Sequence, residues 1–139
     1  ILGAGSHGTT YGGSPLACAT AIATLKVVLR DGLTAHSREM GRMIADEALG
    51  WKLPALAAVR AFGFMIGFEL NTSLIEARED FRSSGQTPSL WVVRQLMAAG
   101  LLTGAAGPRV LRWLAPMNTT EAEVRAGLRI MRETLGSIT

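Results

Sequence analysis

The chain has 139 residues, of which 48% are hydrophobic and 18% charged, which predicts a globular domain with a buried core and excludes disorder. Its formal net charge is +3, but the arginines are scattered and form no basic patch that would indicate nucleic-acid binding. A single cysteine, Cys18, excludes an internal disulfide, and no apolar run is long enough to predict a membrane span. We therefore expect a cytoplasmic protein without nucleic-acid or membrane partners.

The chain opens on a predicted glycine-rich loop. The spacing G-x-G-x-x-G beginning at Gly3 matches a dinucleotide-binding fingerprint, but that motif needs a helix at its third glycine, and none is predicted before Ser14. The overlapping stretch HGTTYGG places two hydroxyls, Thr9 and Thr10, among glycines and just before a helix N-terminus. Such hydroxyl and backbone donors suit an anion such as phosphate, and a tight surface turn is the alternative.

Two helices are predicted next. The first covers 15–30, with Ser14 as N-cap and Gly32 just beyond its end. It is apolar on most sides, so we expect it to be buried against more than one neighbour, with Cys18 as a small core residue. The second covers 33–49 and has an apolar face opposite a charged one.

Two short strands are predicted at 59–62 and 64–70, or one strand that bends at Gly63. A helical turn is expected within 74–82. A helix over 88–99 is expected to face inward with a set of four apolar side chains. These are Leu90, Val93, Leu96 and Met97.

Two further strands are predicted at 101–103 and 110–114, around a glycine-rich turn. The last helix is predicted over 121–135, where Thr120 and Glu123 fit a capping box. The order of elements predicts an α+β fold, with a small, mostly antiparallel sheet covered on one face by helices.

At residues 7–18 the sequence HGTTYGGSPLAC closely resembles the cofactor loop of the class III pyridoxal-phosphate aminotransferases. Within that family it is most similar to acetylornithine aminotransferases, in which HGTTYGGNPLA is typical. Three later stretches resemble family motifs in the same order along the chain. They are GFMIGFEL at 63–70, GLLT at 100–103 and VLRWLAPMN at 110–118.

The resemblance implies the C-terminal small domain of an aspartate aminotransferase-like fold. Residues 1–14 would be the end of the large domain, 15–32 a linking helix and 33–139 the small domain. The implied partners are the large domain of the same protein and a second subunit in a homodimer, with amino-acid and 2-oxoacid substrates.

Residue roles follow from the same match. The hydroxyl and backbone of Thr10 would hold the phosphate of pyridoxal 5'-phosphate bound to the other subunit, and Thr9 would lie beside the substrate. Arg112 matches the arginine that pairs with a carboxylate, either the substrate's or a gating glutamate's. Ala61 and Ala115 stand where the family usually has glycine and proline, which blurs the choice of substrate.

The lysine that binds the cofactor covalently has no counterpart, because neither Lys26 nor Lys52 matches its position. We therefore expect no catalytic residue in this chain, which opens on Ile1 without Met and is interpreted as a fragment that is inactive by itself. The full protein is expected to transfer the terminal amino group of N-acetylornithine to 2-oxoglutarate, in arginine biosynthesis. The alternatives are another donor (ornithine, 4-aminobutyrate or succinyl-diaminopimelate) or a non-catalytic interaction domain.

Other polar residues favour structural roles. His7 is expected to support the loop, and His36 to lie at the surface or in packing. Arg60 and Arg109 could contact substrate, but a solvated ion pair is the stronger expectation for each. No cluster of cysteine and histidine predicts a metal site.

Overall fold

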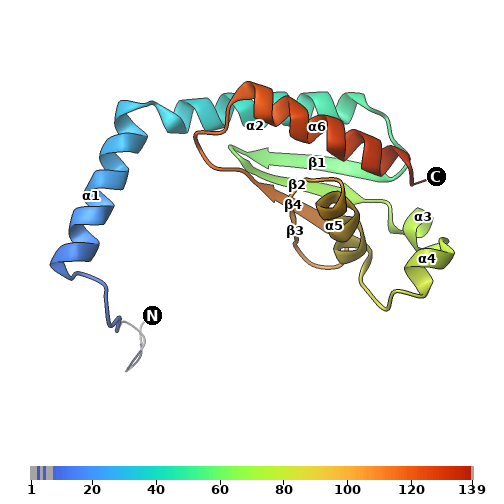
Figure 1. The fold of residues 1–139 in the computed structure, drawn as a ribbon, viewed down its shortest axis with the longest axis horizontal. Helices are drawn as coiled ribbons and strands as arrows, with labels where there is room; N and C mark the ends of the chain where they lie inside the picture. The colour runs from blue at the N-terminus through green and yellow to red at the C-terminus, as the bar shows by residue number, and fades with distance from the viewer. Residues whose placement is uncertain (1–2, 4, 6–7, 139) are drawn as a thin grey trace. The chain divides into compact units, whose positions relative to one another are not determined.

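The computed structural model describes Gly3, Gly5 and residues 8–138, and the chain divides into two compact units, Ile1–Leu33 and Thr34–Thr139 (Figure 1). In the first unit α1 (Pro15–Arg30) begins where Ser14 Oγ accepts a hydrogen bond from Ala17 N–H, at 3.3 Å. It ends before Gly32, whose φ of 61° suits glycine. Both predicted ends of this helix are therefore confirmed.

The apolar surface of α1 is exposed in the described structure. None of its side chains is buried, and Leu16 and Leu29 are 75% and 77% exposed. Cys18 is also exposed, so its predicted place in a core is wrong for this chain. The physical reason is that the described part of the first unit holds no second helix or sheet against which α1 could pack.

The second unit combines five helices and a four-stranded antiparallel sheet of order β1-β2-β4-β3 within the described residues, which confirms the predicted α+β fold. In chain order its elements are α2 (Leu33–Gly50), β1 (Leu56–Phe62), β2 (Met65–Leu70), α3 (Thr72–Glu76), α4 (Glu79–Arg82), α5 (Pro88–Ala98), β3 (Gly104–Ala105), β4 (Val110–Leu114) and α6 (Glu121–Gly136). No helix in the described ranges has the length and hydropathy needed to cross a membrane.

The core lies between one face of the sheet and the helices. Side chains alternate along β2 and β4, so Ile66, Phe68, Leu111 and Trp113 are at most 6% exposed. Figure 1 shows α2 and α6 lying along this face. Burying each such side chain contributes about 1.5–3 kcal/mol. The opposite face, which we call the open face, carries exposed residues such as Met65 and Leu114.

Two close contacts hold α2 and α6 to the sheet. Gly41 of α2 lies against the β1–β2 turn, where an added Cβ would collide with the Gly63 carbonyl. Gly127 of α6 lies under Trp113, whose ring carbons would be 2.6 Å from an added Cβ. Glycine at both positions therefore allows the helices to approach the sheet directly.

Two predictions in the middle of the chain are wrong. Residues 101–103 are not a strand, because the ladder with β4 begins at Gly104. In α5 the buried set includes Trp91 and Val92, whereas Leu90 is 38% exposed and Met97 55% exposed. Of the four side chains predicted to face inward, Leu96 is buried and Val93 packs partly against the core.

Both edges of the described sheet are irregular. β1 forms one edge, and its register with β2 shifts between Leu56 and Ala58. β3 forms the other edge and has two residues. The exposed Arg60 lies on β1.

The start of α6 is the predicted capping box. The Glu123 carboxylate accepts hydrogen bonds from Thr120 Oγ at 2.7 Å and from Thr120 N–H at 2.8 Å. These bonds, the side-chain bond first, lower the pKa of Glu123 below its ordinary value of 4.5.

A carboxylate with a lowered folded-state pKa stabilises the fold above its unfolded pKa, and that stability is lost as the pH falls through the folded value. We therefore expect the protein to lose stability on acidification below about pH 4.5 more steeply than the Glu123→Gln variant. Urea unfolding at a series of pH values measures this, with Glu133→Gln on the same helix as the matched control. Equal pH profiles for the Glu123→Gln variant and the unsubstituted protein would contradict it.

Candidate functional site

The loop before α1 uses its two threonines differently. Thr9 Oγ1 accepts a hydrogen bond from Gly12 N–H at 3.2 Å, and an added Cβ at Gly12 would collide with the Thr9 methyl group. Thr10 is exposed, and its hydroxyl makes no hydrogen bond to any residue that the structure describes. Thr9 therefore stabilises the turn, while the hydroxyl of Thr10 is available to a ligand.

The backbone of this loop is shaped by Gly13, whose φ of 79° places it in the left-handed region. Ser14 N–H donates to Tyr11 O at 3.3 Å, which closes the turn directly before α1. Tyr11 is 81% exposed. His7, which was expected to support the loop, lies outside the described residues.

Arg112 projects from the open face of the sheet. It is exposed, and its neighbours across the strands are Gly67 on β2 and Gly104 on β3. Within the described ranges its guanidinium has no carboxylate or hydrogen-bond partner. Arg112 can therefore offer two parallel N–H groups to a carboxylate from outside the described structure.

The other predicted polar candidates are engaged in internal contacts. Arg60 Nη2 lies 3.1 Å from Glu69 Oε2, and Arg109 Nη2 donates to Thr72 Oγ1 at 3.5 Å.

His36 Nε2 lies 2.8 Å from the Thr119 carbonyl oxygen, and its ring meets Phe64 edge to face. The packing role expected for His36 is confirmed. Thr9 and Thr10 belong to the first unit, and Arg112 belongs to the second.

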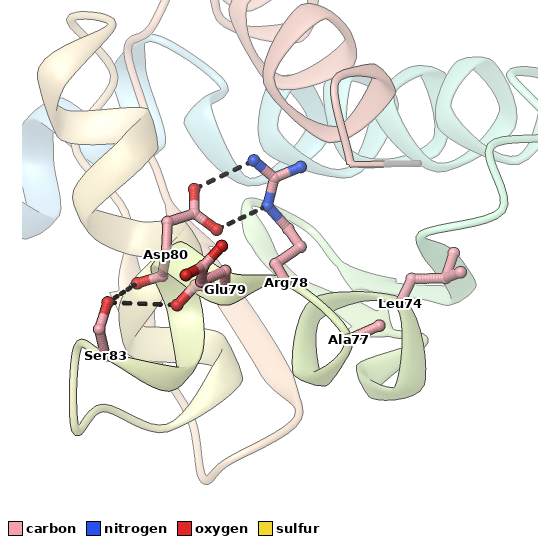
Figure 2. A pocket seen from close by; sticks show the side chains of 6 residues that line it. All are labelled: Leu74, Ala77, Arg78, Glu79, Asp80 and Ser83. Atoms are coloured by element: carbon pink, nitrogen blue, oxygen red, sulfur yellow. Dashed lines mark hydrogen bonds and ion pairs between the residues drawn. The ribbon is translucent and has the colours of Figure 1, made fainter.

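A hollow beside α3 and α4 also carries charged groups (Figure 2). Arg78 Nε and Nη2 each donate to the Asp80 carboxylate at 3.0 Å, which lowers the pKa of Asp80 and raises that of Arg78. The same guanidinium lies 5.4 Å from the Trp91 ring centre and donates to Ser137 O at 3.4 Å. Because Asp80 already neutralises its guanidinium, Arg78 is a poor anion site. Its contacts instead join the start of α4 to Trp91 and Ser137.

A second hollow lies between α2 and the β1–β2 turn and reaches the end of β4. Its lining includes Phe62, Met65 and Leu114, which are 83%, 53% and 62% exposed. Arg38 and Arg42 of α2 also line it. Exposed large apolar side chains in one place are typical of a surface that another part of a protein covers.

No group of three or more metal-ligating side chains is found among the described residues. The loop of the first unit offers hydroxyl and backbone amide groups, and Arg112 of the second unit offers a guanidinium. All three are donors that suit anions. Phosphate and carboxylate are the anions that these groups bind most often in proteins.

Comparison with known protein families matches residues 1–135 to Aminotransferase class-III. The chain belongs to this family. It is 31% identical over 137 residues to an acetylornithine aminotransferase from Synechocystis, covering 96% of this chain and 29% of that protein. It is 33% identical over 131 residues to a probable 4-aminobutyrate aminotransferase from Bacillus subtilis, covering 91% and 29%. An ornithine aminotransferase from Bacillus cereus is 34% identical over 120 residues, covering 86% and 26%.

Solved structures show the same fold. The acetylornithine aminotransferase of Elizabethkingia anophelis matches with a TM-score of 0.78 and 25% identity, covering 96% of this chain and 33% of that one. The ornithine aminotransferase of Toxoplasma gondii, described with partial occupancy of PLP at its active site, matches with a TM-score of 0.79 and 25% identity, covering 99% and 30%. The chain thus spans about a third or less of the length of the proteins it matches.

Sequence reasoning missed Gly104 as a neighbour of Arg112. It placed Gly104 in a turn, whereas the structure places it on β3 opposite Arg112. The residue type gave no signal of this, because glycine is common in turns. The cross-strand register, which is a property of the folded sheet, identifies it.

Proposed function

We propose that the full-length protein is a pyridoxal-phosphate-dependent aminotransferase that transfers the terminal amino group of N-acetylornithine to 2-oxoglutarate, in arginine biosynthesis. The observation that carries this is the family match over residues 1–135, together with an acetylornithine aminotransferase at 31% identity. Ornithine and 4-aminobutyrate are the alternative donors, because relatives of comparable identity carry those names. Succinyl-diaminopimelate is a further alternative donor.

The loop residues fit the phosphate of the cofactor. Class III aminotransferases depend on pyridoxal phosphate, which carries the amino group between donor and acceptor when it is bound. The exposed Thr10 hydroxyl would donate to a phosphate oxygen, with backbone N–H groups beside it. In this proposal the phosphate belongs to the cofactor of the second subunit of a homodimer.

Thr9 and Arg112 would orient the substrate. Thr9, held by its bond from Gly12 N–H, would lie beside it. The guanidinium of Arg112 would bind a carboxylate through two parallel N–H groups, which fixes the direction of the substrate as well as its position. A gating glutamate could occupy the same guanidinium between turnovers.

The remaining two thirds of the protein would supply what this chain lacks. Residues 1–14 would be the end of the large domain, 15–32 a linking helix and 33–139 the small domain. The exposed apolar residues of α1 and of the second hollow would then pack against the large domain. We place the protein in the cytoplasm.

We expect the 139-residue chain to be inactive alone. Lys26 lies in the middle of α1, and Lys52 follows α2 with a φ of 52°. Neither matches the position of the lysine that binds the cofactor, so in this proposal that lysine comes from another part of the protein.

The proposed reaction is tested with the full-length protein and added pyridoxal phosphate. Formation of glutamate from 2-oxoglutarate is measured with N-acetylornithine, ornithine, 4-aminobutyrate and succinyl-diaminopimelate as donors. The highest kcat/KM with N-acetylornithine supports the proposal, and a higher value with another donor selects that alternative. Absence of amino transfer from all four donors would favour a non-catalytic interaction domain.

Thr10→Ala is expected to raise the Kd of the full-length protein for pyridoxal phosphate about tenfold, through the loss of one hydrogen bond to a charged group. Stability should change little, because the Thr10 side chain is exposed. Equilibrium dialysis measures the Kd. Thr24→Ala is the matched control, since the Thr24 hydroxyl bonds within α1. An unchanged Kd for Thr10→Ala would refute the role assigned to this hydroxyl.

A further inference from the structure

A row of four residues crosses the open face of the sheet. Strand register places Arg60, Gly67, Arg112 and Gly104 opposite one another on β1, β2, β4 and β3. Arg112 thus has a glycine on each side. The surface beside its side chain is therefore backbone, where other residues would place a side chain.

The physical reason for glycine differs between positions 67 and 104. An added Cβ at Gly67 would lie 3.3 Å from Val110 Cγ1, so tight packing favours glycine there. At Gly104 the nearest atom to an added Cβ would be Arg112 Nη2 at 3.7 Å, with Arg112 Nε at 4.0 Å, which is ordinary contact. The φ of Gly104 is not among the positive values of the described glycines. Neither space nor backbone conformation requires glycine at 104.

Glycine in a strand lowers stability and often marks a bulge, a tight bend, or a place where a ligand or another backbone approaches closely. The Gly104 distances show that the Arg112 guanidinium lies beside the backbone of the edge strand. Because an added Cβ at 104 already lies in contact with the guanidinium, the further atoms of a longer side chain would occupy space beside Nη2 and Nε. They would cover the N–H groups that a carboxylate needs.

The two arginines of the row differ in whether a neighbouring carboxylate neutralises their charge. Arg60 is neutralised by Glu69, whose Oε2 lies 3.1 Å from Arg60 Nη2. Arg112 has no such partner in the part of the chain that the structure describes. A carboxylate that reaches this face therefore meets an uncompensated guanidinium at Arg112.

We propose that Gly104 is a positioning residue, whose missing side chain keeps the Arg112 guanidinium open to the carboxylate of an amino acid or 2-oxo acid. This inference rests on the proposed function, because that function makes Arg112 the carboxylate-binding residue. Gly104 acts through access to Arg112 and touches no reacting atom.

The test uses full-length protein carrying Gly104→Val, since valine suits a strand and should not lower the temperature of unfolding. The probe is glutarate, a dicarboxylate without an amino or keto group, and its Kd is measured by isothermal titration calorimetry. We expect Gly104→Val to raise the Kd about tenfold. Gly104→Ala should stay within about twofold, because its Cβ fits at ordinary contact distance. Ala105→Val, next on the same strand and exposed, is the matched control.

A double-variant cycle separates access from general damage. In an Arg112→Ala background, Gly104→Val should have no further effect on the Kd. An unchanged Kd for Gly104→Val, while Arg112→Ala weakens binding, would overturn this inference and leave the proposed function standing. An unchanged Kd for Arg112→Ala would instead count against the role that the proposed function gives to Arg112. A lower unfolding temperature for both Gly104 variants would show a structural role and would also overturn the inference.

Discussion

Replacing Gly41 with alanine is expected to lower the free energy of unfolding by about 3 kcal/mol or more, which is the upper part of the range for overpacking a core. Gly41 is buried in α2, and its Cα faces the backbone of the β1–β2 turn. An added Cβ would collide with the Gly63 carbonyl oxygen and lie 2.7 Å from its carbonyl carbon. Backbone cannot turn aside as a flexible side chain can, so α2 would have to move away from the sheet.

Urea unfolding followed by tryptophan fluorescence measures this change, since Trp91 and Trp113 are part of the core. Gly50→Ala, at the end of the same helix, is the matched control because an added Cβ there meets nothing within 4 Å. It should leave stability unchanged or raise it by up to about 1 kcal/mol. If both variants behaved alike, the close contact between α2 and the turn would not be a determinant of stability.

If the proposed function holds, Arg112→Ala raises the KM of the full-length protein for its carboxylate substrates by roughly 100-fold, which corresponds to about 3 kcal/mol. The side chain is exposed and unpaired in the described structure, so its removal breaks no internal contact. Arg112→Lys keeps the charge but loses the planar pair of N–H groups. We therefore expect lysine to restore part of the affinity.

Steady-state kinetics with 2-oxoglutarate as the varied substrate measures the effect. Arg129→Ala on α6 is the matched control, because Arg129 is also exposed and lies on a helix that covers the other face of the sheet. The carboxylate-binding role would be wrong if the Arg112→Ala and Arg129→Ala enzymes had the same KM.

Helix ends were predictable from the sequence because their signals are local. Ser14 caps α1, and Thr120 with Glu123 caps α6, as the residue types indicate. The prediction of a strand at 101–103 was wrong because the first backbone N–H group of this segment bonds to the end of α5. Leu101 N–H donates to Leu96 O at 2.8 Å, following Gly100 with a φ of 93°. The apolar run alone could not show that this backbone closes α5.

The buried face of α5 was missed for a tertiary reason. The Ser89 hydroxyl donates to Gly107 O at 2.6 Å and Ser89 N–H donates to Pro108 O at 3.0 Å, which fix the helix on the β3–β4 turn. This anchoring turns Trp91 and Val92 inward. A periodicity of aliphatic residues carries no information about such a bond.

The candidate site was predictable to the extent that it lies in contiguous motifs. Thr9 and Thr10 stand within a motif specific enough to suggest a phosphate, and Arg112 stands within a later one. Their roles stay predictions. The different roles of the two threonines depend on the hydrogen bond from Gly12 N–H, and the position of Gly104 depends on strand register. Neither could be predicted from the sequence, because both are properties of the folded chain.

The irregular edges of the sheet oppose aggregation through strand addition. Strands add to one another through long, regular rows of unpaired backbone groups at a sheet edge. In the described structure β3 offers two residues, and β1 is interrupted by its register shift and carries the charged Arg60. The open face thus exposes apolar side chains such as Met65 and Leu114, while the irregular edges discourage growth into fibrils.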